Sequence, residues 1–147
     1  MVGSLRVEES GPGVIGDVIF GDPASFRYAA ALALQSEKFT QAVFSQIANL
    51  APFFTGLAIY NPGTVAAQVT IEVYNATGVL AGQASVPVGA GQRISRLVSQ
   101  LVPATASQAG GYVNIRSSQP IIAQELFGDT GSNFLSAVPP TVVAAPK

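Results

Sequence analysis

The fold is decided by residues 68–74, Gln-Val-Thr-Ile-Glu-Val-Tyr, in which polar and apolar side chains alternate strictly. Alternation with a period of two is typical of a strand with one buried and one exposed face. Residues 75–78 (Asn-Ala-Thr-Gly) follow as a turn, and residues 79–86 have the composition of a returning strand. The centre of the chain is therefore predicted to be a β-hairpin.

Similar patterns lie on both sides of this hairpin. Residues 53–60 alternate and end at Asn-Pro-Gly (residues 61–63), which is a strong turn signal, and residues 112–116 alternate again. Short strands joined by Gly, Pro and Asn turns favour an all-β fold, an antiparallel β-sandwich of seven or eight strands that is immunoglobulin-like. The apolar positions of the strands are expected to form the core: Leu57, Ile59, Val69, Ile71, Val73, Val113 and Ile115.

One segment departs from the alternation. Over residues 95–102 the apolar side chains fall on one face of a helix, Ser95 is placed to cap its N-terminus, and Pro103 stops the run. We therefore expect one short helical segment near 95–102, crossing the end of the sandwich.

The chain also repeats itself. Residues 14–22 (Val-Ile-Gly-Asp-Val-Ile-Phe-Gly-Asp) return as residues 121–129 (Ile-Ile-Ala-Gln-Glu-Leu-Phe-Gly-Asp), an offset of 107 residues. The flanking segments also align: 5–7 with 113–115, 10–12 with 118–120, 25–26 with 133–134, and 29–30 with 137–138. A repeat of this length is a whole domain rather than a solenoid turn. The two copies are expected to share one strand-and-turn conformation.

This repeat divides the chain into three parts. Residues 1–35 are interpreted as a partial repeat, either the tail of a preceding module or a strand-exchange segment. Residues 36–140 are interpreted as one complete β-sandwich module. Residues 141–147 form a C-terminal tail, expected to be a linker or an edge strand. Strands cut from their own sandwich expose unpaired edges, so the N-terminal part is expected to pair in cis or in trans.

The composition excludes several classes of function. The chain has no Cys and no His, which removes disulfides, thiolate ligands and the commonest general base. A net charge of −1 provides no attraction for nucleic acid or an anionic membrane. No apolar run approaches the roughly 18 residues of a transmembrane helix, and no signal peptide is recognised.

The chain is nevertheless apolar, with a mean hydropathy of +0.41 and only 10% charged residues, against about 25% in typical domains. Two explanations are consistent with this composition. One is a well-packed β domain with a surface of Ala, Ser and Gln. The other is an apolar surface that is covered by further copies of the protein.

The carboxylates are the remaining candidates for chemistry. Glu72 lies on the polar face of an alternating strand and is expected to be solvated. Glu125 lies in an apolar strand, so its burial would require a structural ion pair. Its candidate partners are Arg93, Arg96 and Arg116. The other carboxylates are Glu8, Glu9, Asp17, Asp22, Glu37 and Asp129.

Asp22 and Asp129 each follow Phe-Gly at equivalent places in the repeat, and both are expected to close a turn by accepting backbone N–H groups. Residues 128–131 (Gly-Asp-Thr-Gly) superficially resemble an aspartic-protease loop, but Pro23 follows the other Asp, so a second such loop is missing. The glycines at residues 88–91 lack the strand–helix context of a phosphate loop. No catalytic, cofactor-binding or metal-binding residue is assigned, no cofactor is expected, and the protein is predicted not to be an enzyme.

The tyrosines offer an alternative in carbohydrate binding. Tyr28, Tyr60, Tyr74 and Tyr112 would be available to stack on sugar rings. Aromatic side chains in strands are more often core residues or cross-strand pairs, and the chain lacks Trp. Carbohydrate is therefore kept as the second candidate ligand.

Five short motifs suggest a family: residues 54–63, 74–78, 110–113, 118–120 and 127–129. Together they resemble a repeat of large secreted or surface-exposed bacterial proteins, arranged as tandem immunoglobulin-like sandwiches. The resemblance implies an extracellular or cell-surface location and a structural or adhesive module, such as a filament or surface-layer subunit. Its partners would be other copies or neighbouring modules. The resemblance supplies no catalytic residues.

Overall fold

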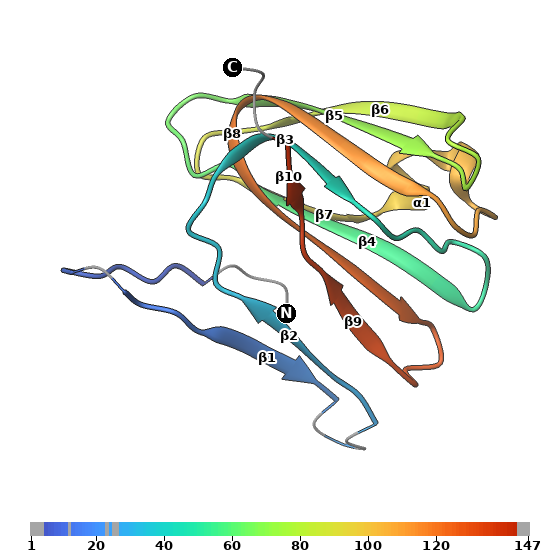
Figure 1. The fold of residues 1–147 in the computed structure, drawn as a ribbon, viewed down its shortest axis with the longest axis horizontal. Coiled ribbons are helices and arrows are strands. Elements are labelled where there is room, and N and C mark those ends of the chain that lie inside the picture. Colours follow the sequence, from blue (N-terminus) through green and yellow to red (C-terminus); the bar gives the residue numbers. More distant parts are fainter. Residues whose placement is uncertain (1–4, 12, 23, 25–26, 144–147) are drawn as a thin grey trace.

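The computed structural model describes residues 5–11, 13–22, 24 and 27–143. It consists mainly of antiparallel strands arranged as two facing layers, with a separate hairpin beside them (Figure 1). In chain order the elements are β1 (Asp17–Gly21), β2 (Ala29–Ala33), β3 (Phe39–Phe44), β4 (Phe53–Tyr60), β5 (Ala67–Tyr74), β6 (Leu80–Val88), β7 (Arg93–Leu97), α1 (Val98–Leu101), the 3-10 turn η1 (Pro103–Thr105), β8 (Tyr112–Asp129), β9 (Leu135–Val138) and β10 (Thr141–Val142).

Strand β8 belongs to both layers. Its first part pairs with β3 and β5, which gives a layer in the order β10-β3-β8-β5-β6. Its second part pairs with β4 and β9, which gives a layer in the order β7-β4-β8-β9. All of these pairings are antiparallel, and residues 36–140 contain seven strands. The prediction of an all-β, antiparallel β-sandwich is confirmed.

The core lies between the two layers. All seven residues expected there are buried, with Leu57 the most exposed of them at 2%. Further core residues that the alternation does not predict lie on β3, the loop after it and α1: Phe39, Phe44, Ile47 and Val98. Since apolar alternation identified the buried face of β4, β5 and the start of β8 correctly, the register of these strands is set by their hydrophobic pattern.

The expected turns are also present. Gly78 has a φ of 79° and its N–H donates to the Asn75 carbonyl, so the turn between β5 and β6 uses the freedom of glycine. The Asn61 side chain accepts the N–H of Gly63. Residues 141 and 142 pair with β3, so the start of the C-terminal tail is an edge strand. Residues 144–147 of that tail lie outside the described ranges.

The helix is shorter than expected. Residues 93–97 continue as β7, where Ser95 pairs with Ala58, so Ser95 is not the N-cap. Leu97 is the N-cap instead, and α1 covers only Val98–Leu101 before η1 begins at Pro103. The five residue pairs between β7 and β4 fix the backbone of this segment, whereas an isolated helical turn gains little. Tertiary pairing therefore overrides the helical pattern at residues 95–97.

Candidate functional site

The N-terminal hairpin is the most unusual part of the molecule. Strands β1 and β2 pair only with each other among the described residues, and β2 lies alongside β9 at one edge of the sandwich (Figure 1). Its register matches that of β8 and β9: Gly21 faces Ala29, as Gly128 faces Leu135. The prediction that both copies adopt the same conformation is confirmed for the strand at residues 17–21, which corresponds to residues 124–128 of β8.

One part of the repeat alignment was wrong. The strand registers equate residues 29–30 with 135–136 and not with 137–138. The connection in the second copy is one residue shorter than that in the first, whereas the sequence alignment made it longer. The proposed match of residues 25–26 with 133–134 lies outside the described residues, as does residue 12.

The two aspartates of the repeat hold turns, as predicted. Asp22 Oδ1 accepts the N–H of Ala24 at 2.9 Å. Asp129 Oδ1 accepts the N–H of Asn133 at 2.7 Å and that of Phe134 at 3.3 Å. The side-chain hydrogen bond from Asn133 holds the pKa of Asp129 below its usual value. Both carboxylates therefore shape the end of their hairpin.

The two copies differ sharply in burial. Three apolar side chains of the N-terminal copy are exposed: Leu5 by 69%, Val7 by 49% and Val14 by 54%. The aligned side chains of β8 are fully buried: Val113, Ile115 and Ile121. Residues 5–11 and 13–16 form no strand, so the strand conformation expected from the repeat is absent at residues 5–7 and 14–16.

The reason for this difference is the set of neighbouring strands. In β8, the equivalent residues pair with β3, β5 and β4. Residues 5–11 and 13–15 have no such neighbours in the part of the chain that the structure describes, and the Gly16 carbonyl accepts the N–H of Leu34. Further along the same copy, Ile15 and Ile19 are 93% and 73% exposed. The segment thus presents apolar side chains at the surface, and one edge of β1 has no partner strand among the described residues.

Glu125 is the most unusual side chain of the core. It lies on β8 with its side chain fully buried, and neither carboxylate oxygen has a hydrogen-bond partner. Burial raises the pKa of Glu125 to about 9, so the carboxyl group is protonated at neutral pH. The predicted ion pair with Arg93, Arg96 or Arg116 was wrong. Strand alternation places Glu125 on the inner face with Ile121 and Ala123, whereas Arg96 and Arg116 are exposed.

A polar cluster covers the outer face of the layer that contains β3, β8 and β5. Asn114 Nδ2 donates to Glu72 Oε2 at 2.5 Å, and Arg116 Nε lies 3.6 Å from the same oxygen. Glu72 is therefore bound to its neighbours and is less solvated than expected. The rings of Tyr74 and Tyr112 stack beside this cluster with centroids 4.8 Å apart. This stacking confirms that the two tyrosines form a cross-strand aromatic pair. The pKa of Tyr74 is raised, mainly by burial and in addition by the negative charge of Glu72.

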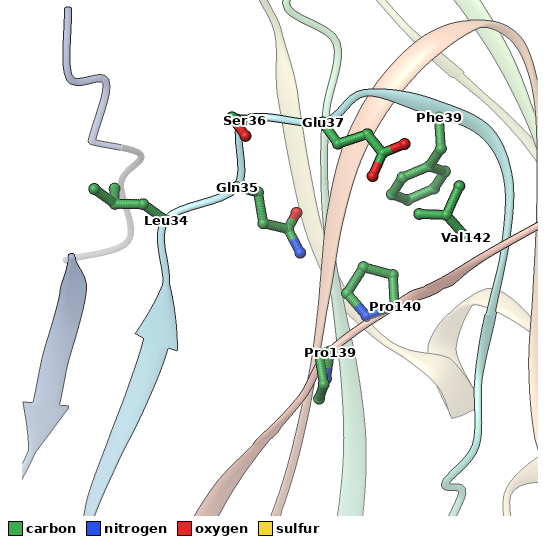
Figure 2. A pocket seen from close by; sticks show the side chains of 8 residues that line it. All are labelled: Leu34, Gln35, Ser36, Glu37, Phe39, Pro139, Pro140 and Val142. Atoms are coloured by element: carbon green, nitrogen blue, oxygen red, sulfur yellow. The ribbon is translucent and has the colours of Figure 1, made fainter. Parts of the chain in front are cut away.

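A cavity of about 250 Å³ lies where the N-terminal segment joins the sandwich. Figure 2 shows it between the linker that follows β2 and the segment that joins β9 to β10. Its lining residues are Leu34, Gln35, Ser36, Glu37, Phe39, Pro139, Pro140 and Val142. Gln35 Oε1 is buried there without a hydrogen-bond partner. This pocket lies at the joint between the hairpin and the module.

The other predicted candidates stay apart from one another. Glu8 pairs with Arg6 at 2.8 Å, Glu9 accepts the N–H of Val14, Asp17 is exposed on β1, and Glu37 lines the cavity. Within the described ranges, no group of three or more Asp or Glu side chains is arranged to hold a metal ion. No helix in those ranges has the length and hydropathy needed to cross a membrane.

Comparison with known proteins supports the architecture. The fold is similar to a solved structure titled Anabaena sensory rhodopsin transducer, with a TM-score of 0.52 and 22% sequence identity, over 62% of this chain and 98% of that one. The sequence matches no protein-family model, and no curated protein matches it significantly. At this identity the likeness supports a β-rich fold alone. The resemblance to secreted immunoglobulin-like repeats, with the location it implies, stays a prediction.

Proposed function

We propose that the protein is a non-enzymatic β-sandwich module that assembles in series or with other copies, and that its N-terminal segment is the assembly element. The observation that carries this proposal is the exposure of apolar side chains on a segment whose β8 counterpart is buried in a sandwich. A structural or adhesive role at the cell surface, as in a filament or surface layer, is the setting in which such a module would act.

The energetics favour pairing of this segment. Burying one large aliphatic side chain contributes roughly 1.5–3 kcal/mol, and Leu5, Val7, Val14, Ile15 and Ile19 are all exposed. An unpaired strand edge is also a template for main-chain hydrogen bonds with another strand. Net charge is only −1, so there is little repulsion between copies. The solved protein of similar fold is titled a transducer, a name that fits an interaction module.

Sedimentation of the full chain and of a variant without residues 1–34 tests this proposal. The full chain should self-associate, and the shortened chain should be a folded monomer. A full chain that remains monomeric at high concentration would contradict assembly with other copies.

A pair of matched substitutions locates the surface. Val7→Ser with Val14→Ser should weaken association, because both side chains are exposed on the N-terminal segment whereas the aligned Ile115 and Ile121 are buried. Val79→Ser should leave association unchanged, because Val79 is 60% exposed but lies at the turn before β6. Equal loss of association in both variants would place the contact elsewhere.

Carbohydrate binding is the second candidate. The observation that favours it is the stacked pair Tyr74 and Tyr112 beside Glu72, Asn114 and Arg116, on an outward sheet face. Calorimetric titration with a set of glycans measures it directly. Binding that is lost in Tyr112→Ala would support a ligand-binding module, whereas absence of heat with every glycan would remove this candidate.

A further inference from the structure

We propose that residues 5–33 complete a second β-sandwich of the same kind, one that lacks its own strands equivalent to β8 and β9. This rests on the proposed function and specifies its partner. The position that the segment would fill is the β8 slot, bounded by β3 and β5 in one layer and by β4 in the other.

The backbone of the segment has the correct free edge. In the complete module, β8 has β9 on one side and β4 on the other, with eight residue pairs from Phe53–Asp129 to Tyr60–Ile122. In the N-terminal copy, β2 takes the place of β9. The opposite edge of β1 is therefore the edge that β4 covers in the complete module. A strand equivalent to β4 would pair there in the same register.

The side chains of the segment also suit the slot. The repeat aligns Leu5, Val7 and Val14 with the fully buried Val113, Ile115 and Ile121. At each of these three aligned positions both copies have an apolar side chain of similar volume, and cores tolerate such exchanges well. These three exposed side chains are thus ones that a sandwich would bury, whereas Ile15 and Ile19 align with the half-buried Ile122 and Leu126.

The buried carboxyl group of Glu125 is a further difference between the two copies. Glu125 has no partner in the core, whereas the aligned position in the N-terminal copy is Val18. Val18 would enter the slot without burying a polar group, which costs free energy when it lacks a hydrogen bond. The N-terminal copy is therefore better suited to an apolar slot than β8 at this position.

The one extra residue of the segment falls at a tolerant place. Gly13 has no counterpart between Pro120 and Ile121, and its φ is 108°. In β8, the corresponding point lies between residue 117, the last paired with β5, and residue 122, the first paired with β4. A glycine with positive φ suits a β-bulge. The extra residue would thus lie where the strand passes from one layer to the other.

A sandwich with a vacant slot is a better partner than a complete second copy. In a complete copy the slot already holds β8. If the N-terminal segment of another chain replaced β8 there, Leu5, Val7 and Val14 would be buried, but the aligned side chains of β8 would become exposed. The net gain in buried apolar surface would then be small. A partner without β8 and β9 gains the whole contact, and the segment loses its exposed apolar surface.

A fusion tests the inference on the full chain. Residues 36–112 are placed a second time, directly before Leu5, so that Tyr112 of the added segment leads into the copy of β8. Because the chain contains no Cys, a pair of introduced cysteines reports the register. Ala58 pairs with Gln124, and Gln124 aligns with Asp17. Ala58→Cys in the added segment with Asp17→Cys should therefore form a disulfide.

Two controls make the result decisive. Ala58→Cys with Gln124→Cys in the unfused full chain shows that the native pair crosslinks. In the fusion, Val14→Asp should abolish the 17–58 crosslink, because its counterpart Ile121 is fully buried. Ile15→Asp should leave it, because its counterpart Ile122 is only half-buried.

The outcomes separate this inference from the proposed function. A fusion whose added segment is rapidly digested by protease, or that forms no 17–58 crosslink, overturns the inference. Self-association of the unfused chain would then still support assembly by another contact. A 17–58 crosslink in the fusion supports the inference even if the unfused chain is monomeric. Crosslinking between unfused Asp17→Cys and Ala58→Cys chains would overturn the requirement for a vacant slot.

Discussion

The hairpin of β8 and β9 and the N-terminal hairpin of β1 and β2 share a sequence pattern and a register, but only the first is embedded in a sandwich. β8 is a strand over Tyr112–Asp129, whereas its N-terminal copy is a strand only over Asp17–Gly21. Among the described residues of this copy of β8, residues 17–21 are the ones that have a partner strand, β2. The repeated sequence therefore forms a strand where a partner strand is present, in line with the context dependence of β-propensity.

The largest expected effect is on the pH dependence of the free energy of unfolding. It concerns two aligned residues, Glu125 in β8 and Val18 in the N-terminal copy. The native state keeps the proton of Glu125 up to a pKa of about 9, whereas the ordinary pKa of a glutamate, 4.5, applies to the unfolded chain. Between these values only the unfolded state releases the proton, so the free energy of unfolding falls as pH rises. At about 1.4 kcal/mol for each pKa unit, the total loss is roughly 6 kcal/mol.

Urea unfolding measured from pH 4 to pH 9 checks this prediction. Glu125→Val should remove most of the fall and should stabilise the protein at pH 8. Val18→Glu is the matched control, and it should leave the pH dependence of the wild type unchanged because β1 lies outside the sandwich. A wild-type protein with no loss of stability between pH 5 and pH 8 would contradict an isolated, protonated Glu125.

The next effect compares aligned apolar residues. Ile115→Ala removes a fully buried side chain from β8 and should lower the free energy of unfolding by about 2–5 kcal/mol. Val7→Ala at the aligned position should change it by less than about 0.5 kcal/mol, because Val7 is exposed. Denaturant titration of both variants measures the contrast. Equal losses would show that residues 5–7 are already packed within the isolated chain.

The smallest expected effect compares the two turn aspartates. Asp129→Ala removes the acceptor of the N–H groups of Asn133 and Phe134, whereas Asp22→Ala removes the acceptor of the Ala24 N–H. We expect Asp129→Ala to lower the thermal midpoint more, because its turn connects strands of the sandwich. The pKa of Asp129 is lowered, so its contribution should disappear as pH falls through that lowered pKa. Thermal unfolding at pH 7 and pH 3 checks both statements.

The sequence predicted the features that depend on neighbours within one strand. Alternation identified the inner faces of β4, β5 and β8, and Asn and Gly identified the turns. It was misleading where a partner strand decides the outcome. Residues 95–97 pair with β4 and are not helical, and residues 5–8 lack a partner and form no strand.

The candidate surfaces depend on contacts that sequence spacing does not reveal. Glu72, Asn114 and Arg116 meet because β5 and β8 are neighbours in one particular register. Glu125 was recognised as unusual from its apolar surroundings. Its lack of a partner depends on which face the arginines occupy, and strand alternation in β8 already places Arg116 and Glu125 on opposite faces. This alternation therefore already excludes an ion pair between Arg116 and Glu125.

The pairing of β3 with β10 has a mechanical consequence. The chain enters the sandwich at Phe39 and leaves it after Val142, and Val142 pairs with Ala42 in an antiparallel ladder. A pulling force applied at these two points would act across that ladder and separate its hydrogen bonds one after another, like a zipper. In a chain of such modules under tension, β10 would peel away first. The array would lengthen first by the short segment of β10, while the pairing of β3 with β8 still held the two layers together.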